Sequence, residues 1–346
     1  MSAYDKYQID GQKLSLHPER VASWMDGYNI APIYMEVSPS GACNHRCIFC
    51  ALDFVGYEKR FLKAEKLIDC ITQASCMGLE SVMYAGEGEP LLHPEFELIT
   101  AKCAPYVAQA ITTNGVMLTK QMSESILRDI AWIKVSVNAG TAKAYQAMHR
   151  CNEGDWVKVW DNIADAVSLR DQNKWPCSIG TQMVLLKDNE KTAGLFAQWS
   201  QEVKADYAVI KPYSQHLASK SKVEPGITYD DFNRFDIPVI YRKNAFDRAH
   251  KSKDYRHCYA LPFWAYLDAG GNVWGCSAHM GNQEWNYGNI YRQEFADIWN
   301  GPYRKEHVAY VKNEMDISEC RINCRMDVCN EYLWRVMHPE GHDAFI

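Results

Sequence analysis

Long apolar runs are missing from this sequence, and its first residues do not show the pattern expected of an N-terminal targeting signal. Nothing in it approaches the roughly 20 apolar residues that span a bilayer. The first residues, MSAYDKYQIDGQ, are polar and charged, so we do not expect them to form a signal peptide. Positive charge is not in excess either, because 43 acidic and 37 basic side chains leave a formal net charge of −6. We therefore predict a cytoplasmic protein with neither a nucleic-acid nor a membrane partner.

The sequence also has no internal repeat, no low-complexity tract and no long Gly/Ser linker. Hydrophobic residues make up 47% of its 346 residues, which is enough for a sizeable core. This length suits one large domain, or one large and one small domain.

Cysteine, by contrast, is abundant, with thirteen residues. A disulfide framework is disfavoured in a reducing compartment, so metal or cluster ligation is the better interpretation of the clustered cysteines. Five others show no cluster spacing and are predicted to be core residues, namely Cys70, Cys76, Cys103, Cys151 and Cys177.

Between about residues 30 and 215, short apolar strands alternate with amphipathic helices. The predicted strands are 33–37, 81–85, 108–112, 133–137, 179–186 and 207–211, and the clearest helices are 63–77 and 156–173. This alternation predicts a parallel sheet built from crossover units. Six units favour an α/β fold with a partial (β/α)6 TIM-like barrel, in which functional residues gather at the C-terminal ends of the strands.

The pattern changes beyond the barrel, where a polar segment is followed by a predicted β-hairpin and short helices. The hairpin strands are 263–267 and 272–275, and the helices are 295–299 and 303–312. The predicted division is an N-terminal segment (1–30), the barrel (31–215), a connecting segment (216–257) and a small C-terminal α+β domain (258–346).

Three cysteines lie close together on the loop that follows the first strand. Cys43, Cys47 and Cys50 are separated by three and two residues. Three thiolates can hold three irons of a [4Fe–4S] cube and leave the fourth iron open for a small chelating ligand. A structural zinc site is the alternative, but zinc needs a fourth ligand, and His45 lies between the cysteines at an awkward spacing.

With the aromatic Phe49 before its last cysteine, this pattern resembles the motif of the radical S-adenosylmethionine (SAM) superfamily. The resemblance implies a [4Fe–4S] cluster on Cys43, Cys47 and Cys50, with SAM on the open iron. It also implies that a flavodoxin- or ferredoxin-type donor supplies an electron that cleaves SAM to methionine and a 5′-deoxyadenosyl radical. That radical abstracts a hydrogen atom from the substrate.

The second predicted strand ends in a glycine-rich turn. Gly86, Gly88, Glu89 and Pro90 resemble the Gly-Gly-Glu-Pro motif of the same superfamily, with Glu87 in place of the first glycine of the pair. The resemblance implies that this turn meets the SAM ammonium group, because glycine admits a ligand close to the backbone and oxygen atoms accept its hydrogen bonds. An ordinary strand-to-helix turn is the alternative.

Polar residues at the ends of the later strands complete the predicted site. The resemblance places Asn114, Ser136, Asn138 and Gln182 near SAM, and Lys211 as a substrate contact of the catalytic site. Strand-end position supports these roles, although each residue has an alternative as a turn or barrel-rim residue.

Five cysteines near the C-terminus, Cys258, Cys276, Cys320, Cys324 and Cys329, resemble the SPASM or twitch extension of radical SAM enzymes. The resemblance implies an auxiliary [4Fe–4S] cluster, and five thiols suffice for one cluster. We predict that Cys258, Cys276, Cys320 and either Cys324 or Cys329 hold it. The thiol left over is structural or donates a hydrogen atom to a substrate radical. A four-cysteine zinc site is the alternative.

The resemblance favours an enzyme that oxidises or epimerises a sugar-like small molecule. Single-cluster relatives often act on sugars, and only about thirty residues precede the barrel, too few for a peptide-recognition domain. A peptide-modifying epimerase or crosslinking enzyme is the second hypothesis. A non-catalytic iron–sulfur or zinc scaffold is the third, and the strand-end motifs beside the cysteine triad argue against it.

Overall fold

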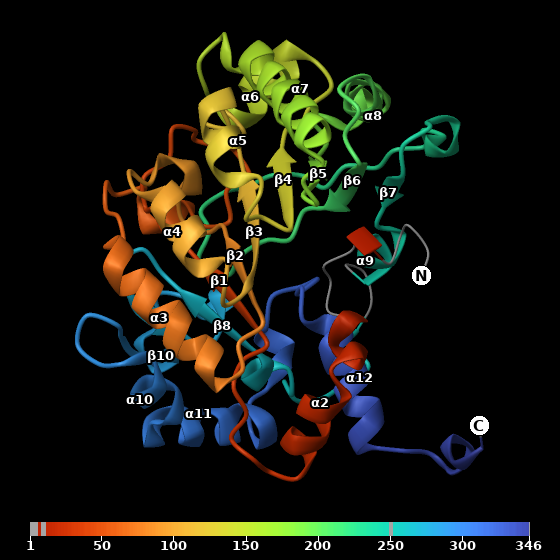
Figure 1. Ribbon diagram of the computed structural model, residues 1–346. Coiled ribbons are helices and arrows are strands. Elements are labelled where there is room, and N and C mark those ends of the chain that lie inside the picture. The colour runs from red at the N-terminus through yellow and green to blue at the C-terminus, as the bar shows by residue number, and fades with distance from the viewer. Residues whose placement is uncertain (1–5, 8–11, 249–251, 346) are drawn as a thin grey trace.

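The fold is built around one curved sheet of ten strands (Figure 1). The computed structural model describes residues 6–7, 12–248 and 252–345. The strands are β1 (Tyr34–Val37), β2 (Ser81–Tyr84), β3 (Ala108–Thr113), β4 (Trp132–Ser136), β5 (Ser178–Leu185), β6 (Tyr207–Pro212), β7 (Val239–Tyr241), β8 (Trp264–Leu267), β9 (Asn272–Trp274) and β10 (Asn286–Asn289). Their order across the sheet is β10-β9-β8-β1-β2-β3-β4-β5-β6-β7, and β1 to β7 pair in parallel.

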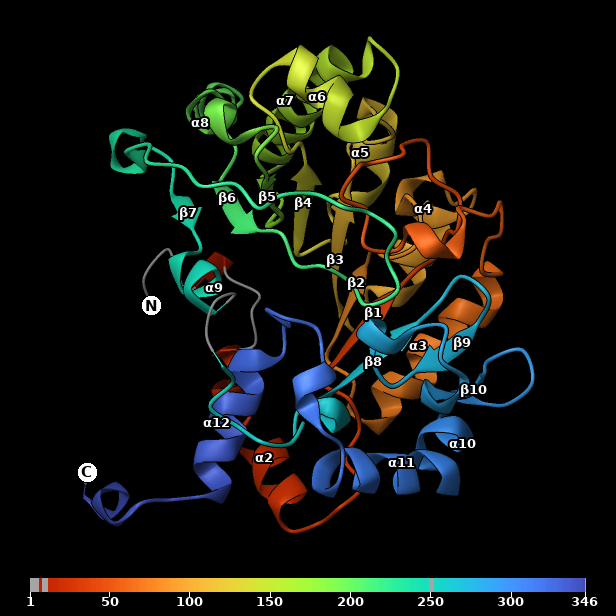
Figure 2. The ribbon, with the colours of Figure 1, turned by 180° about the vertical axis from the view of Figure 1, so that it is seen from behind.

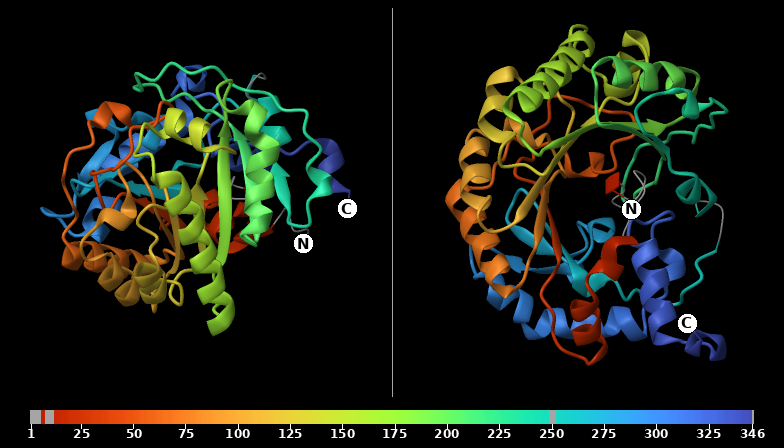
Figure 3. Two further views of the ribbon diagram at one scale, coloured as in Figure 1. Left: turned by 90° about the horizontal axis from the view of Figure 1, so that it is seen from above. Right: turned by 45° about the vertical axis from the view of Figure 1, so that its right-hand side comes forward.

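Helices cover the convex face of the parallel strands, while the concave face is left to loops and the C-terminal segment (Figure 3). The helices are α2 (Pro18–Met25), α3 (Ala64–Met77), α4 (Phe96–Cys103), α5 (Lys120–Ile126), α6 (Ala142–His149), α7 (Asp155–Asn173), α8 (Ala193–Glu202), α9 (Lys243–Arg248), α10 (Phe295–Asn300), α11 (Pro302–Asn313) and α12 (Asp327–Met337). Among the described residues, no helix is both long and apolar enough to cross a membrane.

Helix α3 illustrates why these segments fold as they do. Its apolar residues Leu67, Ile71 and Ala74 recur every three or four positions and are fully buried in the main core cluster. The helix ends at Gly78, which has a φ of +116° and so takes the left-handed conformation that favours glycine. Burial of this one apolar face holds α3 on the sheet.

The predicted α/β partial barrel with a small C-terminal region of mixed structure is confirmed. All six predicted barrel strands are present within one or two residues of the expected bounds. A seventh parallel strand, β7, lies within the segment 216–257 that was predicted only to connect. β7 has only three residues, which are too few to show the alternation of apolar and polar residues that identifies a strand in the sequence.

The C-terminal strands extend the barrel sheet on its other side. β8 pairs in parallel with β1, and β9 and β10 continue the sheet in antiparallel fashion. The sheet does not close between β10 and β7 within the described residues, so the barrel is partial.

The segment that follows β6 crosses back over the strand ends, as seen from behind in Figure 2. Ser219 donates a hydrogen bond to the carbonyl of Cys50 at 3.3 Å, and His216 Nε2 lies 2.7 Å from the carbonyl oxygen of Ser277. This segment therefore covers the strand ends and links the first cysteine loop to the C-terminal region.

Candidate functional site

A cavity of about 400 Å³ lies inside the partial barrel, at the C-terminal ends of its strands. Its lining includes residues from the first cysteine loop, the ends of β1 to β6 and β8, and the loop before α12. The position is the one expected for functional residues in folds of parallel strands and helices.

The first cysteine loop is held in place by backbone hydrogen bonds to the end of α6. The N–H of Arg46 donates to the carbonyl of His149, and the N–H of Ile48 donates to that of Met148, both at 2.9 Å. Cys43, Cys47 and Cys50 all line the cavity. The structure thus brings together the three predicted thiols on a loop fixed at its centre.

The surroundings of these thiols suit a metal cluster better than free thiolates. Burial raises the pKa of Cys43 to about 12, and burial together with the neighbouring Cys50 and Cys43 thiols raises that of Cys47 well above its usual range. Three thiolates gathered in one partly buried place need a cation to offset their charge. Three sulfur donors open to a cavity match a [4Fe–4S] cluster with one free iron.

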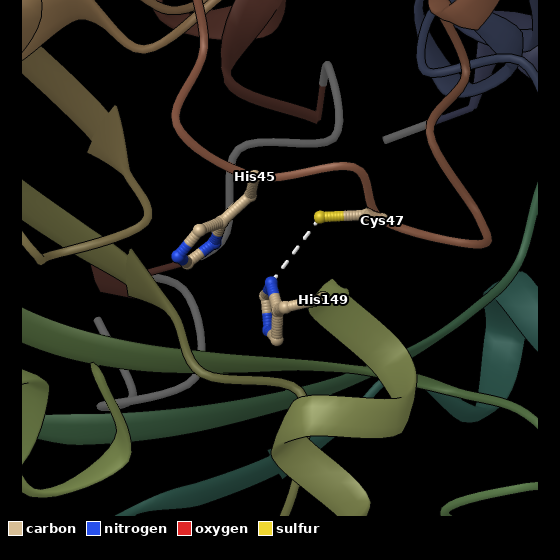
Figure 4. A group of neighbouring side chains, drawn as sticks. All are labelled: His45, Cys47 and His149. Atoms are coloured by element: carbon tan, nitrogen blue, oxygen red, sulfur yellow. Dashed lines mark hydrogen bonds between the residues drawn. The ribbon is translucent and has the colours of Figure 1, made fainter. Parts of the chain in front are cut away.

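Two histidines lie beside these thiols (Figure 4). His45 belongs to the loop itself and was considered only as an awkwardly spaced zinc ligand, whereas His149, at the end of α6, was missed by sequence reasoning. Nδ1 of His149 is 3.2 Å from Sγ of Cys47, and its Nε2 is 2.9 Å from the carbonyl oxygen of Val137. His45 Nε2 lies 3.3 Å from a carboxylate oxygen of Asp155. His149 is 102 positions from Cys47, so no local spacing could have revealed the contact.

His45, Cys47 and His149 could hold a metal ion among themselves, since one ligand atom from each lies within 4.8 Å of the others. Burial and the neighbouring His45 lower the pKa of His149 to about 3, so its imidazole is neutral. A metal ion bound by His45, Cys47 and His149 would use only one of the three thiols and would leave Cys43 and Cys50 without a metal. A cluster bound by the three cysteines uses all three thiols, so it fits this set of donors better.

The glycines of the turn after β2 are required by close backbone packing. A Cβ at Gly88 would lie 2.2 Å from the carbonyl oxygen of Ala42, and one at Gly86 would lie 1.7 Å from Oγ of Ser38. Gly86 also has a φ of +102°. The turn therefore fits directly against the segment that leads into the first cysteine loop.

Both acidic residues of this turn have defined partners. The Glu89 carboxylate accepts hydrogen bonds from Thr113 Oγ1 at 2.6 Å and the Asn114 N–H at 2.7 Å, as well as from the Leu91 N–H at 3.1 Å. Glu87 pairs with Arg60 at 3.0 Å. Burial raises the pKa of both carboxyl groups. Glu89 thus fastens the β2 turn to the end of β3 within the cavity wall.

The other predicted SAM contacts fall into two groups. Ser136 and Gln182 line the cavity, with Gln182 Nε2 donating to Ser136 Oγ at 3.3 Å, and Asn114 Nδ2 donates to Asn44 Oδ1 at 2.7 Å. Asn138 also lines the cavity, but its Oδ1 accepts from the N–H of Val184 at 2.7 Å, which gives it a structural role.

Pro90 and Lys211 differ in their placement. Pro90 is buried and begins the short 3₁₀ turn Pro90–Leu92, and within the described part of the chain it is not a lining residue of the cavity. Lys211, near the end of β6, does line the cavity. Sequence reasoning missed four further lining cations. Lys134 lies on β4, whereas Arg242, Arg321 and Arg325 come from segments without a barrel-strand pattern.

Four of the five C-terminal cysteines gather at one place. Burial raises the pKa of Cys276 well above its usual range, and the charges of the neighbouring Cys324, Cys258 and Cys320 raise it further. Burial raises the pKa of Cys258 to about 12. Cys276 and Cys324 line the cavity, so this second thiol set reaches the space that the first set faces. Four partly buried thiols supply the full donor set of one cluster.

Cys329 has a different environment. It is 4% exposed on α12 and belongs to an apolar cluster that includes Trp24 and Leu333. Cys324 therefore occupies the position beside the other three thiols, and Cys329 packs among apolar side chains.

Comparison with family models identifies two domains in the chain. The model described as the radical SAM superfamily matches residues 37–197. The model described as an iron–sulfur cluster-binding domain, SPASM, matches residues 258–325. These domains imply a [4Fe–4S] cluster that works with SAM and an auxiliary cluster.

Curated relatives include several GTP 3′,8-cyclases. That of Clostridium acetobutylicum is 29% identical over 229 residues, which cover 64% of this chain and 70% of the relative. That of Chlorobaculum tepidum is 28% identical over 140 residues, 39% of this chain and 42% of the relative. The chain thus spans less than half the length of the second relative.

Solved structures with a similar fold include SuiB of Streptococcus suis bound to SAM, with a TM-score of 0.63 and 17% identity over 95% of this chain and 80% of that one. A second is anSMEcpe with bound AdoMet, with a TM-score of 0.60 and 15% identity over 81% of this chain and 84% of that one. At these identities the likeness establishes the fold alone.

Proposed function

Because the chain belongs to the radical SAM superfamily and carries a C-terminal SPASM domain, we propose that it oxidises or epimerises a sugar-like small molecule. One observation carries this proposal. Cys43, Cys47 and Cys50 line the same cavity as Cys276 and Cys324, so a single bound molecule can face both thiol sets.

The first thiol set is assigned to the cluster that cooperates with SAM. Bound there, cluster and SAM supply a 5′-deoxyadenosyl radical after one-electron reduction by a flavodoxin- or ferredoxin-type protein. The chain's own part is positioning: the turn after β2 packs on the cysteine loop, and the segment after β6 covers the strand ends, which excludes water from the reacting C–H bond.

The size and chemistry of the cavity favour a small polar substrate. A volume of about 400 Å³ lies in the usual range for small-molecule sites. Ser136, Gln182 and Lys211 supply hydrogen-bonding groups suited to a molecule rich in hydroxyls. The names of the curated relatives denote chemistry on GTP, a small molecule that contains a ribose ring, which supports a sugar-bearing substrate over a peptide.

The second thiol set is assigned to the auxiliary cluster, held by Cys258, Cys276, Cys320 and Cys324. A cluster bound by these thiols would supply a one-electron acceptor beside the cavity, as an oxidation of the substrate by two electrons and loss of a proton would require. Epimerisation instead requires a thiol that returns a hydrogen atom, and Cys329 is the thiol outside this set. Its burial among apolar side chains favours oxidation.

The first test combines metal content with SAM cleavage. Anaerobically reconstituted wild-type protein should hold about eight irons per chain and form 5′-deoxyadenosine with dithionite. A Cys43/Cys47/Cys50→Ala variant should hold about four irons and form none. Cys76→Ala, which removes an exposed thiol of α3, should match the wild type. Four irons in the wild type and none in the triple variant would refute the auxiliary cluster.

Substrate class is tested by which compounds accelerate 5′-deoxyadenosine formation. We expect sugar derivatives and nucleotides to accelerate it and short peptides to have no effect. Deuterium from heavy water should be absent from the product of an oxidation and present in that of an epimerisation. Acceleration by peptides alone would replace this proposal with a peptide-modifying function.

A further inference from the structure

A second hollow opens on the surface of the molecule, apart from the cavity at the strand ends. Its volume is about 750 Å³, and its wall comes from the segment that precedes β8 and from the C-terminal ends of α11 and α12. We call it the outer groove and define it by its lining residues Lys253, Asp254, Arg256, Tyr259, Lys312 and Trp334. Of the residues that the structure describes, none lines both the outer groove and the cavity.

The outer groove lies beside the second thiol set. Both chain neighbours of Cys258 line the groove, so the groove wall carries this cysteine. Lys253 Nζ donates a hydrogen bond to the carbonyl of Ile317 at 3.3 Å, and the same carbonyl accepts the N–H of Cys320 at 3.1 Å. One lining cation is therefore fixed to the turn that leads into a second cysteine of the set.

The other two thiols of the set face the opposite way. Cys276 and Cys324 line the cavity at the strand ends, so the second thiol set lies between that cavity and the outer groove. The oxidation proposed above takes two electrons from the substrate, one with the abstracted hydrogen atom and one through the second thiol set. This second electron stays on the protein until an external one-electron acceptor removes it, so every turnover requires such a partner.

Positive charge predominates in the outer groove, although the whole chain has a net charge of −6. Lys253, Arg256 and Lys312 face one lining carboxylate, that of Asp254, which leaves an excess of two positive charges. Within the described residues, none of these three cations forms an ion pair. Asp316, outside the lining, is bound within its own turn. The local charge therefore favours a partner with an acidic surface.

Aromatic side chains form one part of the groove wall. The rings of Tyr259 and Trp334 stack with their centroids 5.5 Å apart, and His338 stacks on Trp334 at 3.9 Å. Lys312 Nζ lies 6.0 Å from the centre of the Tyr259 ring, which holds a cation against the aromatic group. Aromatic residues are enriched at protein interfaces, and a stacked aromatic surface suits the edge of a planar flavin.

We propose that the outer groove is the docking site of an acidic flavodoxin-type protein that removes the electron from the second thiol set, an inference that rests on the function proposed above. In each turnover the flavin of this partner gains one electron from the chain and one proton from water, and no covalent bond of the chain changes. Electron-transfer complexes are typically weak and have small interfaces, which fits a groove lined by ten residues.

Binding is tested with purified oxidised flavodoxin, titrated calorimetrically into anaerobically reconstituted wild-type protein. We expect the Kd to rise at least about tenfold between about 50 and 300 mM KCl, because salt screens exposed charges. Arg256→Glu should weaken binding at least about tenfold, since it replaces an attraction with a repulsion. Asp254→Lys should tighten binding at least about threefold, an effect that damage to the fold would not produce.

Two controls accompany these variants. Lys158→Glu reverses a charge at an exposed position of α7 outside the groove and should keep the wild-type affinity. A ferredoxin of similar net charge is titrated in parallel, and equal or tighter binding of the ferredoxin would overturn the choice of a flavin carrier. Iron content and thermal unfolding establish that each variant is loaded and folded.

The direction of electron flow is tested by stopped flow. Protein reduced with dithionite, and then freed of excess reductant, is mixed with oxidised flavodoxin while the flavin absorbance is followed. The Cys43/Cys47/Cys50→Ala variant keeps the second thiol set and should still reduce the flavodoxin. Arg256→Glu in that background should slow the transfer at low salt at least about tenfold. A Cys43/Cys47/Cys50→Ala protein that binds flavodoxin but leaves it oxidised would overturn the proposed route of the electron.

The outcomes separate this inference from the proposed function. Wild-type protein may form 5′-deoxyadenosine with a sugar derivative while its affinity for flavodoxin is unchanged by Arg256→Glu and Asp254→Lys, and this result would overturn the docking site alone. Protein whose affinity follows both charge changes, but which no sugar derivative or nucleotide stimulates, would uphold the docking site and refute the proposed reaction.

Discussion

Asn330 on α12 holds the loop that carries Cys258. Its Nδ2 lies 3.6 Å from Sγ of Cys258, and its Oδ1 accepts hydrogen bonds from the N–H groups of Tyr259 and Ala260 at 2.7 and 2.8 Å. Asn330 is 2% exposed. One buried amide therefore fixes the backbone that follows Cys258 and also contacts its sulfur.

Asn330→Leu should loosen this loop. Two buried N–H groups would lose their acceptor, and we expect a loss of roughly 2 kcal/mol in the free energy of unfolding. Urea unfolding measures the loss, and iron analysis should show a partly lost auxiliary cluster. Asn313→Leu, at an exposed position of α11, is the matched control and should change neither the stability nor the iron content. Wild-type stability and iron content in Asn330→Leu would contradict this role of Asn330.

Cys324 and Cys329 can be told apart by single substitutions. Cys324→Ala removes a proposed ligand and should lower the iron content from about eight toward about four per chain. Cys329→Ala should keep about eight irons and lose about 1 kcal/mol of stability, because the thiol packs among apolar side chains. Iron lost from Cys329→Ala and retained in Cys324→Ala would reverse the assignment.

Gly88→Ala tests the contact between the turn after β2 and the first cysteine loop. The new Cβ would overlap the Ala42 carbonyl oxygen, so backbone must shift where SAM is proposed to bind. We expect at least a tenfold loss of 5′-deoxyadenosine formation, with the auxiliary cluster retained. Gly154→Ala, where a Cβ meets no atom within 4 Å, should behave as wild type. Full activity in Gly88→Ala would show that SAM binding does not depend on this close packing.

Much of the fold could be predicted from the sequence because its signals are local. The apolar period of α3 and the short hydrophobic strands specify their own structure, and parallel strands with intervening helices leave few arrangements. β7 escaped prediction because three residues give no period. That β8 would join β1 was likewise not predictable, since the pairing joins segments more than 200 positions apart.

The candidate site likewise contains some residues that could be predicted from the sequence and others that could not. The spacing of Cys43, Cys47 and Cys50 identifies them in the sequence, whereas only the tertiary fold brings His149 and Arg242 to the cavity. The choice between Cys324 and Cys329 was open in the sequence because both lie near Cys320. The structure separates them, since Cys329 lies within α12 and turns into an apolar cluster.

The charge of Lys211 should destabilise the protein near neutral pH. Burial and the charges of Arg242, Arg325 and Arg321 lower its pKa to about 7, against the partial compensation by Glu36. The unfolded chain therefore binds one more proton than the native state between about pH 10.5 and 7, and stability falls as the pH is lowered through that window.

Lys211→Met removes this cost. We expect the ligand-free variant to be more stable than wild type by roughly 1 kcal/mol at pH 7, because water in the cavity screens part of the charge, and by less at pH 9.5. Urea unfolding at the two pH values measures both differences. A variant less stable than wild type at pH 7, and no more stable at pH 9.5, would mean that the charge of Lys211 is compensated within the folded protein.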